Sequence, residues 1–376
     1  MSNSQLAGIR VIDLSQFLPG PYAGQICADM GADVLKVEPP DGDPMRQLNP
    51  VTNQRGPAPF HKIINAGKRV VRIDLKSVDG KSAFRQLLSK ADILLESYRP
   101  GVMERLGLGF EDLRQLNPRL IHCALSGYGQ SGPLRARSGH DVNYMAMSGS
   151  LNVTGPAPRP QPAFPPVADY AGAMQAVISI LAALLGRSSS GTGCYLDIAM
   201  ADTMLAWQSF GLTQQGLSQS DATPAPKRAG NLLNGGAACY QVYATADDMF
   251  VALGAIETHF WENFCNAVDR QPWIVRHTDP LPQTDLIAEV SDLFLTRTRD
   301  QWDQSLGDID CCYHPVLDYG ELPEWPQIQA RQLLDFDAES GDFQGVRLPV
   351  WQDGRPPSTR QPMREITQHD ALAAWL

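Results

Sequence analysis

IRVIDL at residues 9–14 and DVLKVE at residues 33–38 are the two runs that indicate the fold class most clearly. Each is short and rich in the branched and apolar residues that strands prefer. Between them a Pro-Gly-Pro turn at 19–21 leads into a helical stretch that ends near Gly31. Two strands joined through one helix form a βαβ unit, whose strands are parallel and whose crossover is right-handed. These residues therefore predict an open, parallel α/β sheet.

The same alternation continues over the first 200 residues. Further strand-like runs occur at Val70–Leu75, Ile93–Glu96, Leu120–Leu125 and Tyr195–Ala199. Helical patterns lie between them at about 78–90, 109–116 and 170–186. Strands that alternate with helices in this way are typical of a Rossmann-like domain.

The first βα turn argues against a dinucleotide ligand. It reads SQFLPGP at residues 15–21, with prolines where a pyrophosphate cradle needs glycines and free N–H groups. A Walker A phosphate loop is also missing from the sequence. A nicotinamide or flavin dinucleotide is therefore disfavoured, although the sheet resembles a Rossmann sheet.

Composition changes after about residue 212 and suggests two domains, as expected for a chain of 376 residues. We predict a large Rossmann-like domain from residues 1–212 and 326–376, a linker at 213–224, and a smaller α+β domain at 225–325. The smaller domain is predicted to hold strands at 238–244 and 249–255, a helix from about Thr258 and a helical region at 283–305. The last 50 residues show no clear period.

Composition and charge exclude several classes of protein. Lys and Arg number 31 and Asp and Glu 41, a net charge of −10, so we expect neither nucleic-acid binding nor a basic membrane-facing surface. The N-terminal residues have no signal-peptide pattern, and the longest apolar run, Ala176–Leu185, is too short to cross a bilayer. Seven cysteines without a CxxC pair indicate reduced thiols in a cytoplasmic protein. We expect no nucleic-acid or membrane partner.

Two clusters carry side chains suited to acid–base chemistry. SGHDVNY at residues 138–144 places His140 between a glycine turn and an apolar helix-like run, and Asp169 directly precedes an apolar helix. A carboxylate at a helix N-terminus is stabilised by the helix dipole and by unpaired N–H groups, which would keep Asp169 ionised at neutral pH. On spacing alone, the commoner interpretations are an N-cap for Asp169, a structural role for His140 and a strand-to-helix cap for Glu257.

The CCYH run at residues 311–314 contains metal-ligating residue types. Two adjacent cysteines do not ligate one ion comfortably, and the sequence has no second cluster of this kind. We therefore predict no metal site.

Several longer motifs resemble the family III CoA-transferase superfamily. They are LAGIRVIDL (6–14) with PGP (19–21), DMGADVLKVE (29–38), DILLESYRPGVMERLGLG (92–109), NPRLI (117–121) and GYGQSGP (127–133). The motifs occur in the family's order, and the resemblance runs from the start of the sequence to about residue 332. It implies a Rossmann-like large domain, a smaller domain, and an interlocked homodimer in which domains of different chains shape each active site.

The superfamily contains two competing chemistries. Its transferases use one aspartate, which matches Asp169, as a nucleophile that forms a mixed anhydride with the acyl group. Its α-methylacyl-CoA racemases use the same aspartate with a histidine in a Gly-His-Asp-x-Asn-Tyr motif, which stands here at Gly139–Tyr144. The racemases also resemble this chain at Gly254–Glu257 and Asn231–Gly236, and the glycine-rich loop of formyl-CoA-type transferases is not visible.

The additional histidine favours the racemase. Inverting the carbon next to a thioester needs one group to remove the α-proton and another to return a proton to the opposite face, with an enolate between them. His140 and Asp169 suit this task, because one can be protonated while the other is not. The resemblance implies that Glu257, acting across the dimer, orients one member of the pair.

We therefore predict epimerisation at C2 of a 2-methylacyl-CoA by His140 and Asp169. No separate cofactor is expected, because coenzyme A is part of the substrate. CoA transfer between an acyl-CoA and a carboxylic acid through Asp169 is the alternative. An acyl-CoA-binding protein that has lost catalysis is the second alternative.

The resemblance also implies a binding path for coenzyme A. Its expected residues are Lys36, Ile73, Asp74, Leu75, Lys76, Tyr98, Arg99, Gly139, Asp141, Asn143 and Tyr144. Lys76 and Arg99 are the expected phosphate partners, because both side chains form charge-assisted hydrogen bonds. Without the resemblance, each would be interpreted as a solvated surface charge. Pro39 stands where the racemases have an arginine, and Lys36 is expected to replace part of its charge.

The local charge agrees with a small polyanion as ligand. Residues 61–110 carry ten Lys and Arg against five Asp and Glu, in a chain that is acidic as a whole. This basic window contains several of the expected CoA-binding residues.

Overall fold

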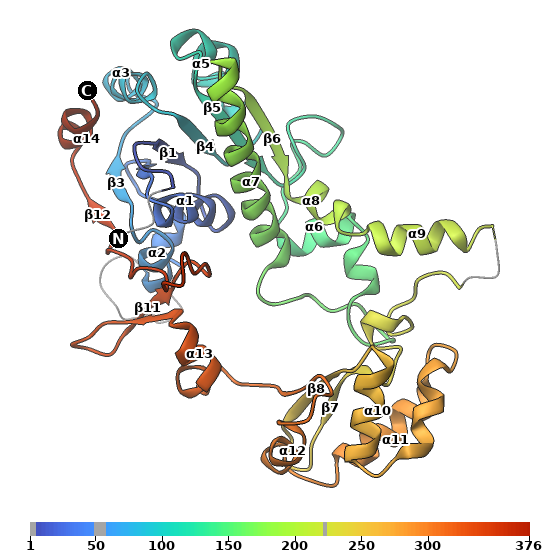
Figure 1. Cartoon of the computed structure of the whole chain (residues 1–376). Coiled ribbons are helices and arrows are strands. Elements are labelled where there is room, and N and C mark those ends of the chain that lie inside the picture. Colours follow the sequence, from blue (N-terminus) through green and yellow to red (C-terminus); the bar gives the residue numbers. More distant parts are fainter. Residues whose placement is uncertain (1–4, 49–57, 221–223) are drawn as a thin grey trace. The chain divides into compact units, whose positions relative to one another are not determined.

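The computed structural model describes residues 5–48, 58–220 and 224–376 (Figure 1). The chain divides into two compact units. The first unit contains Met1–Met145, Pro165–Ala206 and Pro323–Leu376, and the second contains Ala146–Phe164 and Trp207–Leu322. The first unit therefore draws on three separate stretches of the chain.

A parallel sheet forms the centre of the first unit. Its described strands follow the order β12-β3-β2-β1-β4-β5-β6, and every neighbouring pair is parallel. They are β1 (Arg10–Leu14), β2 (Asp33–Glu38), β3 (Arg69–Arg72), β4 (Ile93–Glu96), β5 (Ile121–Ser126), β6 (Tyr195–Ala199) and β12 (Arg364–Glu365). β4 and β5 are buried along their whole length, as parallel strands covered on both faces are. The predicted α/β class with an open parallel sheet is confirmed.

Helices connect and cover these strands. They are α1 (Pro19–Asp29), α2 (Pro59–Ile64), α3 (Val78–Leu88), α4 (Val102–Arg105), α5 (Phe110–Leu116), α6 (Asp141–Met147), α7 (Val167–Ser190), α8 (Met200–Ala206), α13 (Pro326–Arg331) and α14 (Gln368–Trp375). A separate antiparallel pair is formed by β10 (Leu334–Phe336) and β11 (Phe343–Val346). The core between the sheet and α3 contains Phe84, Leu87 and Leu94, which are fully buried.

The Pro-Gly-Pro segment at 19–21 forms the first turn of α1, and the prediction of a separate turn before the helix is wrong. Proline suits this position, because its missing N–H would have no partner there and its fixed φ is already helical. Gly20 is packed so closely that a Cβ atom would lie 2.1 Å from the Cβ of Ser15. The segment therefore seats the start of α1 directly against the end of β1.

The helix α7 is longer than the helical pattern predicted at 170–186. By length and composition it could cross a membrane, a test that core helices also pass, and 39% of its most apolar window is buried. It packs against α1, α8 and β5 within its own unit. Ala176 and Ile180 lie on its buried face, whereas Met174 and Ile178 are exposed.

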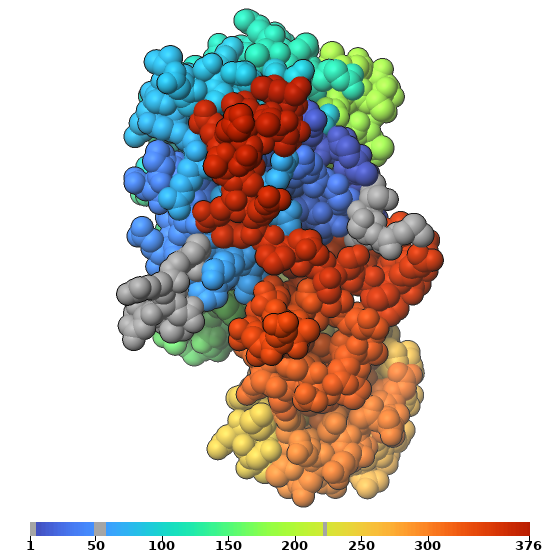
Figure 2. All heavy atoms as spheres, turned by 90° about the vertical axis from the view of Figure 1, so that its left-hand side faces the viewer, coloured from blue at the N-terminus to red at the C-terminus, as the bar shows by residue number. Residues whose placement is uncertain are grey.

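The C-terminal residues close one edge of the sheet. β12 pairs with β3 and α14 packs against α3, so that the red segment in Figure 2 lies over the light-blue one. The Trp375 Nε1–H group donates to Asp33 Oδ2 at 2.8 Å, and Arg10 Nη1 donates to the Trp375 carbonyl at 2.9 Å. These contacts join residues from opposite ends of the sequence, so no local periodicity in the last 50 residues predicts them.

The second unit contains a small antiparallel sheet and a helical layer. Its strands are β7 (Tyr240–Ala244), β8 (Phe250–Gly254) and β9 (Tyr313–Pro315). Its helices include α9 (Ser209–Leu217), α10 (Thr258–Ala267), α11 (Thr284–Phe294) and α12 (Arg299–Leu306). The core between them holds the fully buried aromatic side chains of Trp261, Phe264, Phe294 and Trp302. The predicted α+β character of this region is confirmed.

Two boundaries differ from those predicted in this part of the chain. The helical region at 283–305 is two helices, because Thr298 begins a new one by accepting a hydrogen bond from the N–H of Gln301. The predicted linker at 213–224 starts inside α9, since Gln and Leu are good helix formers despite the polar composition. Residues 221–223 of that linker lie outside the described residues.

Candidate active site

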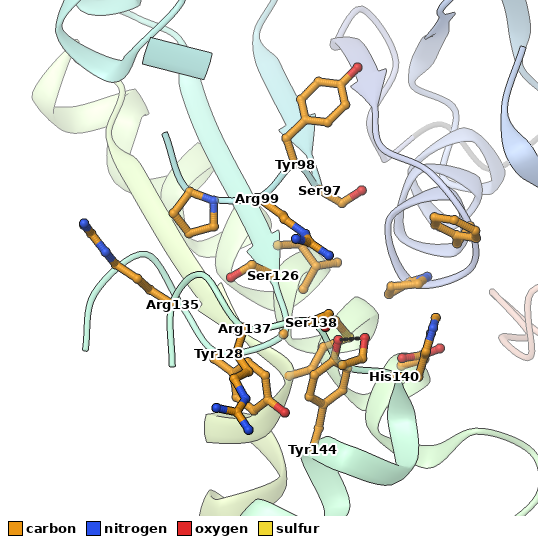
Figure 3. A pocket seen from close by; sticks show the side chains of 18 of the residues that line it. Ser97, Tyr98, Arg99, Ser126, Tyr128, Arg135, Arg137, Ser138, His140 and Tyr144 are labelled. Carbon is orange, nitrogen blue, oxygen red and sulfur yellow. Dashed lines mark hydrogen bonds between the residues drawn. The ribbon is translucent and has the colours of Figure 1, made fainter. Parts of the chain in front are cut away.

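A pocket of about 430 Å³ opens in the first unit beyond the carboxyl ends of β1, β4 and β5 (Figure 3). Its walls are loops that follow these strands, together with residues around the starts of α6 and α7. The lining residues are Gln16, Phe17, Pro19, Ser97, Tyr98, Arg99, Pro100, Leu125, Ser126, Gly127, Tyr128, Arg135, Arg137, Ser138, Gly139, His140, Tyr144, Asp169 and Met200. The order of the strands reverses between β1 and β4, which is where open parallel sheets bind ligands.

Each residue of the segment before α6 has a definable local role. The backbone N–H of His140 donates to Asn143 Oδ1 at 3.0 Å, and the Tyr144 hydroxyl donates to the Gly139 carbonyl at 2.6 Å. A Cβ atom on Gly139 would lie 2.8 Å from the Tyr144 ring, so only glycine allows this approach. These bonds hold the backbone of His140 while its side chain stays exposed at the pocket.

Asp141 does not line this pocket, and its side chain is bound to the start of α7. Its Oδ1 accepts hydrogen bonds from the N–H groups of Ala168 at 2.6 Å and of Asp169 at 3.2 Å. Pro166, which precedes the helix, offers no side-chain cap. Asp141 therefore caps a helix that follows it by 26 residues in the sequence, and its predicted place along coenzyme A does not fit this contact.

Asp169 lies in the first turn of α7 and lines the pocket with His140. Burial and the neighbouring carboxylate of Asp141 raise the pKa of Asp169 to about 6, and His140 opposes the rise. The prediction that the helix N-terminus stabilises the charge of Asp169 is wrong, because Asp141 takes the N–H groups that would do so. Asp169 is nevertheless mostly ionised at pH 7 and can exchange a proton close to neutrality.

Three arginines line the same pocket. Within the described part of the chain, the side chains of Arg99, Arg135 and Arg137 have no hydrogen bond or ion pair. In Figure 3 Arg99 reaches into the space between the labelled side chains, whereas Arg135 points outward. Unpaired guanidinium groups in a pocket favour an anionic ligand, and phosphate accepts such donors well. Arg99 is among the predicted residues, whereas Arg135 and Arg137 are not, and their signal in the sequence is the LRAR run directly before the histidine motif.

Lys36 is fully buried and does not reach this pocket. Its ammonium group forms an ion pair with Asp43 at 3.0 Å and donates to the Ser15 carbonyl at 2.9 Å. Asp43 in turn accepts from the N–H of Phe17, which lines the pocket with a φ of 63°. The prediction that Lys36 replaces an arginine at coenzyme A does not fit this position. The side chain instead supports the loop that forms one wall.

The segment after β3 also lies outside the pocket. Ile73 and Leu75 are buried in the core, and Asp74 Oδ1 accepts from the backbone N–H of Lys76 at 2.9 Å. Lys76 is exposed and borders a separate hollow of about 310 Å³ at the start of α3. Residues 73–76 therefore do not line the pocket that contains His140.

The remaining predicted residues divide between the two units. Tyr98, Arg99, Gly139 and Tyr144 line the pocket, and burial raises the pKa of Tyr98 and of Tyr144 to about 12, so both keep their protons. Asn143 supports the backbone of the histidine motif and is not part of the pocket wall. Glu257 belongs to the second unit, where it directly precedes α10 without capping it through its side chain.

One group of possible metal ligands occurs among the described residues. The side chains of Glu38, Asp43 and His61 lie within 4.8 Å of one another and are buried. Two cations already neutralise the carboxylates, since Arg46 pairs with Glu38 at 2.6 Å and Lys36 pairs with Asp43. His61 Nε2 lies 3.0 Å from the same Glu38. A divalent ion there would be repelled by both cations, so this donor set does not suit a metal.

The arrangement can bind a polyanion and move protons in one place. Three unpaired arginines supply positive charge, and His140 and Asp169 supply two titratable groups on different elements. Such pairs are the usual sign of acid–base catalysis, whereas a single carboxylate would serve a nucleophile.

Comparison with known proteins finds relatives of two different activities. A model of CoA-transferase family III matches residues 6–369. The chain is 35% identical to alpha-methylacyl-CoA racemase from Homo sapiens over 84% of this chain and 79% of the racemase. It is 33% identical to succinate–glutarate CoA-transferase from Agrobacterium fabrum over 97% of this chain and 94% of the transferase. The structure of a CaiB/BaiF family protein from Brucella suis matches with a TM-score of 0.83 at 26% identity, over 99% of both chains.

Proposed function

Because the chain belongs to CoA-transferase family III, we propose that it interconverts the (R)- and (S)-forms of a 2-methylacyl-CoA thioester. The observation that carries this proposal is that His140 and Asp169 line one pocket, at the switch point of the sheet, beside unpaired arginines. A volume of about 430 Å³ lies within the usual range of roughly 300–1,000 Å³ for small-molecule sites.

The substrate is held through its phosphates. Arg99, Arg135 and Arg137 are free to donate to phosphate oxygens of coenzyme A, and Tyr98 offers a neutral hydroxyl group near them. Coenzyme A arrives as part of the substrate, so the reaction as proposed uses no further organic cofactor.

His140 and Asp169 then exchange the α-proton. One of them takes the proton from C2, the C–H electron pair moves into the enolate, and the other returns a proton to the opposite face. A pKa of about 6 lets Asp169 act in either direction near neutral pH.

CoA transfer is the alternative function. The chain is as similar to a succinate–glutarate CoA-transferase as to a racemase, and the carboxylate of Asp169 is open to the pocket. In that reaction the carboxylate attacks the thioester carbonyl, forms a mixed anhydride and releases the CoA thiolate. His140 would not be needed for this step.

One experiment separates these functions. The protein is incubated with a chiral 2-methylacyl-CoA in heavy water, with and without a free carboxylic acid. Deuterium at C2 with loss of chirality, in the absence of the acid, is expected for the racemase and should disappear in both His140→Ala and Asp169→Asn. Acyl exchange that requires the acid and survives in His140→Ala would overturn the racemase in favour of the transferase. Binding without either reaction would leave an acyl-CoA-binding protein.

We further propose that two chains interlock and that Glu257 of the partner subunit orients the acid–base pair. Each unit has apolar side chains left exposed, among them Met174 and Ile178 in the first and Phe210 in the second, which a dimer would cover. Mixing inactive His140→Ala chains with Glu257→Gln chains should restore exchange, because a mixed dimer contains one complete site. A monomer by light scattering, or no recovery on mixing, would contradict this assembly.

A further inference from the structure

We propose that Asp141 is a positioning residue for Asp169, because it caps α7 and thereby holds a second carboxylate beside that of Asp169. The inference rests on the proposed function of the pocket. It concerns a side chain that does not line the pocket itself and that the proposed reaction does not use.

The first step of the argument is the identity of the helix cap. A helix begins with N–H groups that have no partner inside the helix, and a nearby carboxylate is a good acceptor for them. For α7 that acceptor is Asp141 Oδ1, which binds the N–H groups of Ala168 and Asp169 at 2.6 and 3.2 Å. Asp169 therefore sits in the first turn of a helix whose leading donors are already used.

The second step is the effect on Asp169. An aspartate in a first helical turn usually has a lowered pKa, because the dipole and the free N–H groups stabilise its charge. Here the pKa of Asp169 is raised to about 6, first by burial and then by Asp141. The helix does not lower the pKa of Asp169, because its leading N–H groups are occupied and the like-charged carboxylate of Asp141 lies nearby.

Other groups facing Asp169 act around this pair. His140 lowers the pKa of Asp169, and Tyr144 from α6 and Tyr170 from α7 feel its charge but stay neutral, since their own pKa values are raised. Tyr22 of α1 lies edge-on to Tyr170, with ring centres 4.8 Å apart. Asp141 is thus the side chain that adds negative charge beside Asp169.

The third step connects both members of the acid–base pair. Asp141 follows His140 directly and is the first residue of α6, while its side chain is bound to the first turn of α7. One side chain therefore fixes the start of α6 against the start of α7. We expect the separation of the two acid–base groups to depend on this bond.

The test compares two substitutions at this position. Asp141→Asn keeps an oxygen that can accept both N–H bonds but removes the charge, whereas Asp141→Ala removes the cap as well. The pKa of Asp169 is read from the carboxyl carbon of 13C-aspartate-labelled protein, and its signal is assigned by its loss in Asp169→Asn. We expect the pKa to fall by about one unit in Asp141→Asn, and further in Asp141→Ala, where the freed N–H groups can bind Asp169. Asp112→Asn on α5, an exposed carboxylate, is the control and should leave it unchanged.

Kinetics give the second readout. If the proposed exchange reaction is observed, the acidic limb of its kcat/KM profile should move to lower pH in Asp141→Asn by the same amount, with KM little changed. An unchanged pKa for Asp169 in Asp141→Asn would show a purely structural cap and overturn the proposal. Failure of the exchange reaction would overturn the proposed function alone, because the titration is measured on the free protein.

Discussion

Charged side chains gather at two places in the first unit, and the fold treats them in opposite ways. The first place, the buried ion cluster, is built on β1 and β2 and consists of Asp13, Lys36, Glu38, Asp43 and Lys68, all fully buried. Its ammonium groups have carboxylate partners, Lys36 with Asp43 at 3.0 Å and Lys68 with Asp13 at 2.8 Å. Glu38 is paired with an arginine.

The second place is the pocket, where charges lack such partners. In the described structure Arg99, Arg135 and Arg137 pair with no carboxylate, and Asp169 has a neighbouring carboxylate instead of a cation in contact. The pKa of Asp13 is lowered to about 2, because Lys68 and Lys36 outweigh the effect of burial, whereas the pKa of Asp169 is raised to about 6.

Paired charges in the buried ion cluster stabilise the fold, whereas unpaired charges in the pocket are available to a ligand. A buried ion needs a partner, because moving the ion out of water costs several kcal/mol per ion. Where a charged side chain has no partner in the folded chain, a bound ligand can supply the opposite charge. The two regions touch through one loop, since the buried ion cluster holds the backbone of Phe17 at the pocket wall.

The largest effect is expected from breaking the buried ion cluster. Lys68→Met leaves Asp13 and Asn65 without the ammonium group that lies 2.8 and 2.9 Å from their oxygens. We expect the free energy of unfolding to fall by about 3–5 kcal/mol, measured by urea denaturation at pH 7. Lys90→Met, at an exposed position, is the matched control and should change it by less than about 0.5 kcal/mol. A similar small loss for Lys68→Met would show that the cluster does not stabilise the fold.

Acid should weaken the same cluster. The folded pKa of Asp13, about 2, lies below its ordinary value of 3.8, so the ionised form is favoured by folding. This contribution is fully present above about pH 4 and is lost as the pH falls toward 2, at about 2 kcal/mol for Asp13. Urea denaturation between pH 5 and pH 2.5 should record the decline, which Asp13→Asn should make shallower. An equally steep decline in that variant would contradict the assignment.

The unpaired arginines should matter for the ligand more than for the fold. Arg137→Ala removes a guanidinium group that has no partner in the described protein, so the unfolding free energy should be almost unchanged. The Kd for coenzyme A should rise roughly tenfold, or about 1.5 kcal/mol, in calorimetric titrations. Arg114→Ala, whose guanidinium pairs with Glu111 on α5 at 2.8 Å, is the control for lost charge. Equal weakening in both variants would place the phosphate contacts elsewhere.

The smallest expected effect on stability is an increase in the free energy of unfolding, in contrast to the losses above. A folded pKa above the ordinary value means that the ionised form of Asp169 opposes folding at pH values above its folded pKa of about 6. Asp169→Asn should therefore abolish exchange yet stabilise the protein by about 1 kcal/mol at pH 7, a value reduced for partial exposure. The gain should vanish near pH 4, where both forms are neutral in the native state. Destabilisation at pH 7 would mean that the carboxylate has a stabilising partner.

Local sequence patterns predicted most of the sheet. Asp33–Glu38, Ile93–Glu96 and Tyr195–Ala199 agree residue for residue with β2, β4 and β6. For β2 and β4, inside the parallel sheet, burial on both faces requires an apolar run, whereas β6 lies at the sheet edge and is only partly buried. The start of α1 differs from the prediction, since proline is common both in turns and at the first position of a helix. β12 and α14 depend on contacts with β3 and α3, which no window of the sequence contains.

For the site, the residue pattern predicted the chemistry of the side chains but not which of them are buried. His140 and Asp169 were found through the motif and the helix that carry them, and both line the pocket. Less of the positive charge of residues 61–110 is available to a ligand than their composition suggests. Lys68 is buried and paired with Asp13, and Arg69 pairs with Asp33. Burial decides whether a lysine is a support or a ligand contact, and it is set by tertiary packing.

The three-part construction of the first unit has a consequence for synthesis. The edge of its sheet is closed by β12, yet Trp207–Leu322 must leave the ribosome before that strand exists. At ordinary translation rates of roughly 5–20 residues per second, this leaves β3 and its buried neighbours unprotected for about 15–60 seconds. During that interval an exposed strand edge can pair with another nascent chain. Chaperones can therefore assist the synthesis of this protein. Lower growth temperatures or co-expressed holdases should raise the soluble yield.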